Sequence, residues 1–274
     1  MNRVVSLVRT AAVALQRFDH EPNIAHRDPE RERALGHAVN FVETGSFRVR
    51  TTGAWRELGA DSFFVTTPGL EFSCAHDEDQ PPDACLSVRY SDEAVESAQS
   101  SITLSEAPVR RLTNRHAFLR RALRECGRGD EARAEALAGA LLWSLAVDTA
   151  RQPLFRPGRL AWYATRVERA KERIETHYAE PLSLSILARD AGMSVFHFAR
   201  VFGELEGRPP HRYLTDVRLA QAAARLRDGA GVTETCFAVG FGSLSHFVTT
   251  FRRRYGARPS DIRRNGGGRH DGLL

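Results

Sequence analysis

The chain has 274 residues, which is long enough for two domains that each bury a hydrophobic core. Its 42% hydrophobic and 27% charged residues are typical of a soluble globular protein, and no run approaches the roughly 20 apolar residues needed to span a membrane. The formal net charge of +5 is uneven: residues 159–274 carry 19 Lys and Arg against 12 Asp and Glu, whereas residues 1–158 carry 20 against 22. The basic half therefore suits a polyanionic partner.

The cysteines and the N-terminus indicate the compartment. None of the four cysteines forms a C-x-x-C pair, which argues against a four-thiolate zinc site, and no disulfide framework is evident. They are Cys74, Cys85, Cys126 and Cys236. The apolar stretch at the N-terminus is short and bracketed by Arg9 and Arg17, without a cleavage site, so we expect no signal peptide. These patterns predict a cytoplasmic protein.

From Ala38 onward the pattern is typical of β-strands. Short alternating runs are separated by Gly or Pro about every eight to twelve residues, which predicts a sandwich or a barrel within residues 1–105. In one run Phe47 and Val49 should face one side of a sheet and Arg48 the other, because side chains alternate along a strand. Residues 1–35 give no clear pattern.

Several apolar residues of this region are candidates for a ligand pocket. A small molecule lodged between them is one interpretation and an ordinary core is the other, because both need the same side chains. The candidates are Trp55, Phe63, Val65 and Phe72. Cys74 and Cys85 lie near a polar loop and are either a redox pair or two unreactive thiols.

No catalytic or metal-binding pattern is evident in this half. His76 has Cys74 before it and Asp77 after it, but the region contains no H-x-H pair, so we expect no metal site. A nucleophile motif, a phosphate loop and a paired acid and base are also missing from the sequence. We therefore expect neither enzymatic activity nor a cofactor.

Residues 106–150 change to helical spacing. The first predicted helix has its apolar face at Leu112, His116, Leu119 and Leu123. The second begins near Asp130 and carries Leu137, Leu141, Leu142, Leu145 and Val147. This pair either covers the barrel or pairs between chains, and we expect a homodimer through it. Residues 151–159 contain two prolines and a glycine, which predicts an interdomain linker.

Residues 160–264 are predicted to form an all-α domain. It opens with a helix over about residues 161–177 and contains a long connecting helix over 209–227, with Pro209 and Pro210 in its first turn. The last residues, 265–274, are rich in Gly and are predicted to be a disordered tail.

Between these helices lies a helix-turn-helix pattern. A short helix begins at Ser183 and ends at Gly192, and Ser194 caps a second helix that runs to about Leu205. Two short helices joined by a tight turn make a helix-turn-helix unit, whose second helix fits the major groove of DNA.

The same unit occurs a second time. Its first helix ends at Gly240, Ser243 caps its second helix, and that helix becomes basic at Arg252 and Arg253. The aligned pairs are Ala188 with Cys236, Gly192 with Gly240 and Met193 with Phe241 at an offset of 48, then Phe198 with Phe247, Phe202 with Phe251, Gly207 with Gly256 and Pro210 with Pro259 at an offset of 49. The extra residue falls at Gly242, in the turn. We interpret this as an internal repeat, the alternative being two hairpins that merely pack together.

These residues resemble the DNA-binding domain of the AraC/XylS family of bacterial transcription regulators. The resemblance covers about residues 163–264 and is carried by ARDAGMSVFHFARVFGELEGRPPHRYLTDVRLAQAAARLRD and AVGFGSLSHFVTTFRRRYGARPSDIRR. It implies a sequence-specific transcription regulator with double-stranded DNA as its partner. It also implies an α+β chain whose N-terminal part is a cupin-like barrel for dimerisation or for sensing a small molecule. The alternative is an enzyme, cupin-like or DNA-acting, that the helix-turn-helix module targets.

In the first unit the resemblance places Phe196, Ala199 and Arg200 toward the groove. Arg200 is the best candidate for reading a base, because a guanidinium can donate two hydrogen bonds to O6 and N7 of guanine. A salt bridge with Glu204 or a phosphate contact is the alternative role of Arg200. His197 is expected at a phosphate or in solvent.

In the second unit the groove-facing positions hold Leu244, Ser245, Val248 and Thr249. Apolar side chains cannot make bidentate base contacts, so this unit is expected to bind through apolar contacts and phosphates, with weaker sequence selection. The helix cap and the residues expected at phosphates are Ser243, His246, Arg252 and Arg253. Thr235 is expected to bond to a carbonyl of its own helix.

Overall fold

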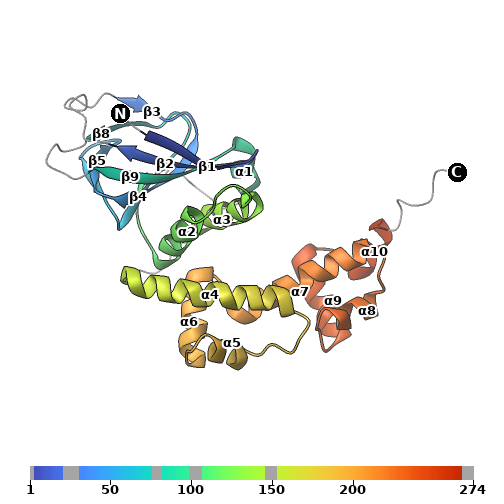
Figure 1. Cartoon of the computed structure of the whole chain (residues 1–274). Helices are drawn as coiled ribbons and strands as arrows, with labels where there is room; N and C mark the ends of the chain where they lie inside the picture. The colour runs from blue at the N-terminus through green and yellow to red at the C-terminus, as the bar shows by residue number, and fades with distance from the viewer. Residues whose placement is uncertain (1–2, 21–30, 76–81, 99–106, 146–152, 267–274) are drawn as a thin grey trace. The chain divides into compact units, whose positions relative to one another are not determined.

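The computed structural model describes residues 3–20, 31–75, 82–98, 107–145 and 153–266 (Figure 1). The chain divides into two compact units, residues 1–156 and 157–274, called unit 1 and unit 2 below. The division falls inside the predicted linker. Unit 1 combines two β-sheets with helices, and unit 2 is helical, so the mixed α and β composition expected from the sequence is observed.

Unit 1 contains two antiparallel sheets. The first has the strand order β1-β2-β9-β4-β7-β10, and the second has the order β3-β8-β5-β6. The strands of the first are β1 (Arg3–Arg9), β2 (Val13–His20), β4 (His37–Thr44), β7 (Ser62–Thr66), β9 (Asp83–Tyr90) and β10 (Val109–Arg111). Those of the second are β3 (Glu32–Arg33), β5 (Phe47–Arg50), β6 (Arg56–Leu58) and β8 (Glu71–Ala75).

The strands described form two open sheets and no closed barrel. The strands predicted between Ala38 and Tyr90 are present, whereas the β1–β2 hairpin lies within residues 1–35, where no strand was predicted. Most of the predicted polar loop lies outside the described residues. A cupin-like fold therefore stays a prediction.

Successive side chains of a strand point to opposite faces of the six-stranded sheet, and both faces are buried. On one face the Phe63 ring lies 4.8 Å from the His116 ring, and the Tyr90 hydroxyl donates to the carbonyl of Ala138 at 3.0 Å, so the helices cover this face. The other face meets the second sheet in a core of Val42, Val49, Leu58, Phe64 and Cys85. Val49 is buried while Arg48 is exposed, as the alternation predicts.

The helices of unit 1 are α1 (Asp92–Ala98), α2 (Asn114–Arg124) and α3 (Glu131–Ser144). The predicted helical pair is confirmed as α2 and α3, although Leu112 precedes α2 and Val147 lies outside the described residues. The α3 leucines are all buried inside unit 1, and Leu141 has no exposed surface. The alternative in which these leucines contact a second chain was wrong, because α2 and the sheet of the same chain cover them.

Unit 2 consists of α4 (Pro157–His177), α5 (Leu184–Asp190), α6 (Val195–Glu206), α7 (Pro210–Arg227), α8 (Val232–Ala238), α9 (Leu244–Tyr255) and α10 (Pro259–Gly266). These include every helix predicted for this region. Helix α4 begins before Ala161 and takes in residues 157–159 of the predicted linker, because a proline in the first turn of a helix has no N–H that needs a partner. Of the predicted tail, residues 265–266 end α10 and residues 267–274 lie outside the described part.

The internal repeat is confirmed by the ends of α5 and α8. Gly192 and Gly240 follow these helices with φ of +64° and +88°, in the left-handed region that favours glycine. In both helix-turn-helix units the backbone N–H of the residue after the glycine donates to a carbonyl of the preceding helix. Met193 donates to the carbonyl of Ala188 at 3.0 Å, and Phe241 donates to that of Cys236 at 3.0 Å. Equivalent residues therefore end both helices in the same way.

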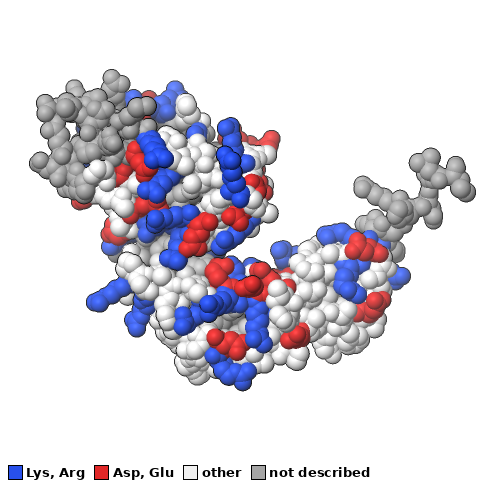
Figure 2. All heavy atoms as spheres, viewed as in Figure 1, with Lys and Arg blue, Asp and Glu red and all other residues white. Residues whose placement is uncertain are grey.

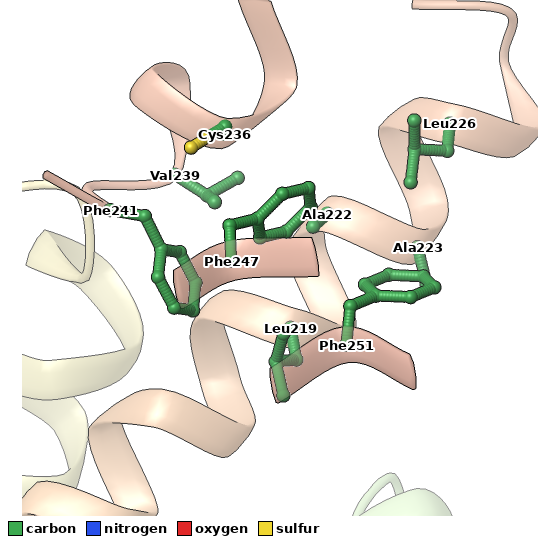
Figure 3. Close-up of a cluster of buried hydrophobic side chains, with 9 residues drawn as sticks. All are labelled: Leu219, Ala222, Ala223, Leu226, Cys236, Val239, Phe241, Phe247 and Phe251. Carbon is green, nitrogen blue, oxygen red and sulfur yellow. The ribbon is translucent and has the colours of Figure 1, made fainter. Parts of the chain in front are cut away.

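The second helices of the two units also begin alike. Ser194 caps α6 by accepting from the N–H of His197, and Ser243 caps α9 by accepting from the N–H of His246, each at 3.4 Å. Each helix buries two phenylalanines four residues apart, with no exposed surface; they are Phe198, Phe202, Phe247 and Phe251. In the second unit these rings join α7 and α8 in one core (Figure 3).

Within unit 2, the two helix-turn-helix units are held together where α8 ends. The Arg218 guanidinium of α7 donates to the carbonyls of Tyr178 at 2.7 Å and Glu180 at 2.8 Å, which fixes the loop between α4 and α5. A Cβ at Gly240 would lie 2.7 Å from the carbonyl oxygen of Ala179 and 3.0 Å from Arg218. The backbone of the second helix-turn-helix unit thus approaches that of the first so closely that only glycine fits at position 240.

Candidate DNA-binding site

The N-terminal half of α6 presents the side chains predicted to face DNA. Phe196 is 90% exposed, Arg200 is exposed, and Ala199 is half-buried beside them. Ser194 lies at the cap, where its hydroxyl is occupied by the N–H of His197. Phe198 and Phe202 point the other way into the core, so the helix has one buried and one free face. The structure thus brings together the residues predicted for the first unit.

Arg200 lies between two side chains of its own helix. Its Nη2 is 3.4 Å from Nδ1 of His197, and its Nη1 is 3.7 Å from a carboxylate oxygen of Glu204. The predicted alternative, an ion pair with Glu204, is therefore present. His197 is half-buried rather than free in solvent, because its Nε2 lies 3.0 Å from the hydroxyl of Tyr163.

The corresponding face of α9 is less polar. Leu244 is 37% exposed, and Ser245, His246 and Thr249 are exposed, as predicted. Val248 differs, because it is partly buried and packs against the core cluster of the second unit. Its side chain thus contributes to the core, and its predicted groove contact stays a prediction.

The basic residues of the two helices are unequal. In α9, Arg252 and Arg253 are exposed, and among the described residues neither forms an ion pair with an acidic side chain. In α6, Arg200 is the one basic residue, and Glu204 and Glu206 follow it. The basic end predicted for the second helix of the second unit is therefore present in α9, whereas α6 ends in acidic residues. On the face seen in Figure 2, positive and negative side chains lie interspersed over unit 2.

Thr235 of α8 does not follow its prediction. Its hydroxyl is buried and has no hydrogen-bond partner among the described residues, rather than bonding to a carbonyl of the helix. Cys236 beside it is buried in the core, and burial raises the pKa of its thiol. Both residues thus act as small core side chains.

Known proteins are similar to this chain in the helix-turn-helix region of unit 2. A helix-turn-helix domain family matches residues 187–265. The virulence regulon transcriptional activator VirF of Yersinia enterocolitica is 32% identical over 97 residues, 35% of this chain and 36% of that protein. The transcriptional activator RhaS of Escherichia coli is 32% identical over 112 residues, 40% of this chain and 39% of that protein. The chain carries a helix-turn-helix domain of the AraC/XylS family.

The matches to these regulators span a little over a third of their length. Among solved structures, the DNA-binding domain of AdpA in complex with a target DNA is 29% identical, covers 36% of this chain and 91% of that one, and gives a TM-score of 0.35.

Two residues of the AraC-type domain that matter for the site were not predicted. Tyr163 reaches His197 from α4, and Arg218 joins the two units from α7. Both lie on helices with no motif of their own. The one available signal was a polar or charged residue on an otherwise apolar helix face, which is too common to mark a site.

The four candidate ligand residues of unit 1 do not converge. Phe63 and Val65 face the helices, whereas Phe72 packs on Phe64 between the sheets at a ring distance of 5.3 Å. Trp55 lies outside both cores, with the Arg50 guanidinium 4.7 Å from its ring centre. Neighbouring residues of a strand point to opposite faces, so these side chains do not line one pocket.

Cys74 and Cys85 are free thiols in the core between the sheets. Burial, with Glu32 and Asp83 nearby, raises the pKa of the Cys74 thiol to about 12. Burial and Asp83 also raise the pKa of Cys85. Since the thiolate is the reactive form, the raised pKa values favour two unreactive thiols over a redox pair.

An open cavity lies elsewhere in unit 1, at the turn between β1 and β2. It has a volume of about 290 Å³, and its lining includes the cationic residues Arg9 and Arg89 with Gln16 and Tyr90. Within the described ranges, no group of three or more His, Cys, Asp and Glu is arranged to hold a metal ion. No helix in the same ranges is long and apolar enough to cross a membrane.

Proposed function

We propose that the protein is a sequence-specific DNA-binding transcription regulator that acts in the cytoplasm and is not an enzyme. The observation that carries this proposal is the pair of equivalent helix-turn-helix units, each with a Ser-capped second helix and a free outer face. The fixed contact of Gly240 with Ala179 supports simultaneous docking of α6 and α9, because it keeps the two helices at a constant spacing. The activators VirF and RhaS favour activation over repression.

The two helices divide the work in this proposal. Helix α6 reads sequence through Arg200, which has the donors for guanine, and through Phe196, which suits a thymine methyl group. Helix α9 supplies affinity through Arg252 and Arg253 at phosphates, because its groove-facing side chains offer few bidentate contacts. Selectivity for DNA sequence should therefore come mostly from the first helix-turn-helix unit.

Selection from random oligonucleotides with the full-length chain tests this division. Arg200→Ala should relax the preference at one base pair and weaken specific binding by about 1–3 kcal/mol. Arg253→Ala is the matched control, because it should weaken binding evenly on all sequences and reduce the salt dependence. A wild-type chain without salt-dependent DNA binding would refute the function, and an unchanged motif in Arg200→Ala would reassign Arg200 to phosphate.

Unit 1 is proposed to form a homodimer. The leucines of α3 are occupied inside the chain, so the contact we propose is the outer face of α3 around Trp143, which is 50% exposed. Sedimentation velocity should show a dimer for the full-length protein and a folded monomer for Trp143→Glu. A wild-type monomer at micromolar concentration would contradict the proposal.

A small-molecule effector is proposed for the cavity at the β1–β2 turn. Arg9 and Arg89 are among the residues that line it, and their positive charges favour a compact anion, such as a carboxylic acid of a few carbon atoms. A thermal-shift screen of small organic acids should raise the melting temperature of the wild type but not of Arg89→Ala. Equal shifts in both proteins would place the ligand elsewhere.

A further inference from the structure

Helix α4 holds the turn of the first helix-turn-helix unit from both sides. On one side, Nε of Arg166 donates to the carbonyl of Ala191, the residue that ends α5, at 2.9 Å. The same guanidinium stacks on Trp162, 3.5 Å from the ring centre. On the other side, the hydroxyl of Tyr163 meets Nε2 of His197, in the first turn of α6, at 3.0 Å. The turn is thus fixed to α4 at its entry and at its exit.

The contact at His197 continues to the residue proposed to read DNA. Nδ1 of His197 lies 3.4 Å from Nη2 of Arg200. A guanidinium can only donate hydrogen bonds, so Nδ1 must be the unprotonated nitrogen and must accept. In the neutral ring the proton then lies on Nε2, which donates to the hydroxyl oxygen of Tyr163. The hydroxyl of Tyr163, which can donate or accept, accepts in this arrangement, so one neutral tautomer of His197 satisfies the contacts with both Tyr163 and Arg200.

Burial decreases along these contacts, from Tyr163 through His197 to Arg200. Tyr163 is only 4% exposed, His197 is half-buried with its ring 5.4 Å from that of Tyr163, and Arg200 is exposed. A fixed group at the buried end thus orients a mobile group at the exposed end. Glu204 limits Arg200 from the opposite side at 3.7 Å, so the guanidinium is confined along the outer face of α6.

We propose that Tyr163 is a positioning residue for base recognition, which acts through His197 to orient Arg200. This inference rests on the proposed function. It makes the base preference of α6 depend on the docking of α4, although α4 itself contacts no base in this scheme. Tyr163 is therefore a specificity-determining residue outside the helix-turn-helix unit.

The experiment measures base preference in the full-length chain. Tyr163→Phe removes the acceptor for His197 while keeping the ring in the core. The loss of one hydrogen bond should reduce discrimination at the base pair read by Arg200 by roughly threefold to tenfold, with little change at other positions. His197→Ala should do the same, whereas His197→Gln should restore most of the preference, because its amide offers one donor and one acceptor.

A double-mutant cycle separates positioning from general loss of structure. In the Arg200→Ala background, Tyr163→Phe should change the base preference no further, because its effect passes through Arg200. Tyr213→Phe is the matched control: it removes the hydroxyl of another buried tyrosine of unit 2, which donates to Glu175, and should leave the motif unchanged. Melting temperatures show that each variant is folded.

The outcomes are distinct. A wild-type chain that does not bind DNA refutes the proposed function itself. If the wild type selects a motif and Tyr163→Phe selects the same motif with the same discrimination, the positioning role is refuted and the function stands. A Tyr163→Phe effect that is uniform over all sequences, or equal with and without Arg200, also refutes it.

Discussion

Replacing Gly240 with alanine tests whether the two helix-turn-helix units are locked by their backbone contact. Gly192 is the matched control, because it occupies the same place in the repeat and also has a positive φ. A Cβ at Gly192 would meet nothing within 4 Å, whereas at Gly240 it would lie 2.7 Å from the carbonyl oxygen of Ala179. The pair therefore separates backbone strain from the steric clash.

The expected magnitudes follow from these two terms. A left-handed conformation costs an alanine about 1–2 kcal/mol at either position. The clash at Gly240 adds about 1–3 kcal/mol, since the neighbour is backbone and the Arg218 guanidinium is itself fixed by two carbonyls. Gly192→Ala should therefore lower the free energy of unfolding by about 1–2 kcal/mol, and Gly240→Ala by about 2–5 kcal/mol.

Urea unfolding of the full-length variants, followed by far-ultraviolet circular dichroism, measures the difference. Gly240→Ala should also weaken binding to a selected bipartite site more than to nonspecific DNA, because the second unit shifts relative to the first. Equal destabilisation by the two substitutions would refute the lock. So would a Gly240→Ala variant with wild-type preference for the spacing of the two half-sites.

Three further predictions concern buried side chains. Thr235→Val should raise the free energy of unfolding by about 1 kcal/mol without changing DNA binding, because it removes a buried hydroxyl that lacks a partner, and a loss of stability in urea would contradict this. Burial, with Arg115 and Arg110 nearby, lowers the pKa of His116 from 6.5 to about 4. The unfolded chain therefore takes up a proton more readily, so the free energy of unfolding falls by about 3 kcal/mol as the pH drops from 6.5 toward 4. His116→Gln should flatten this part of the pH profile of stability, and an unchanged slope would exclude His116 as its source. Leu141→Glu should unfold unit 1, at a cost of about 4–5 kcal/mol, rather than merely separate two chains, and a native circular dichroism spectrum for this variant would contradict the burial of Leu141.

The sequence by itself determined the repeat in unit 2. Its signals are local: a glycine where φ is positive, a serine that caps the next helix, and two phenylalanines one turn apart. Each acts within a few residues, so the order of the residues is enough to predict the helix ends. The same holds for the positions of the strands between Ala38 and Tyr90, which Gly and Pro separate. Alternation did not specify which side chains are buried, because β7 and β9 are buried on both faces.

The tertiary structure decided what covers each apolar face. The α3 leucines show a buried face, but the sequence does not say whether a sheet of the same chain or a second chain buries it. Trp55 and Phe72 are apolar like Phe63, yet only the packing of two sheets shows that they do not share a pocket.

The contacts that shape the candidate site were also beyond the sequence. Arg218, Ala179 and Gly240 come from separate helices and loops, and so do Tyr163 and His197. A helix pattern gives the face of each residue but not the distance to a residue many turns away. Such contacts depend on how whole helices pack, and only the folded chain fixes that packing.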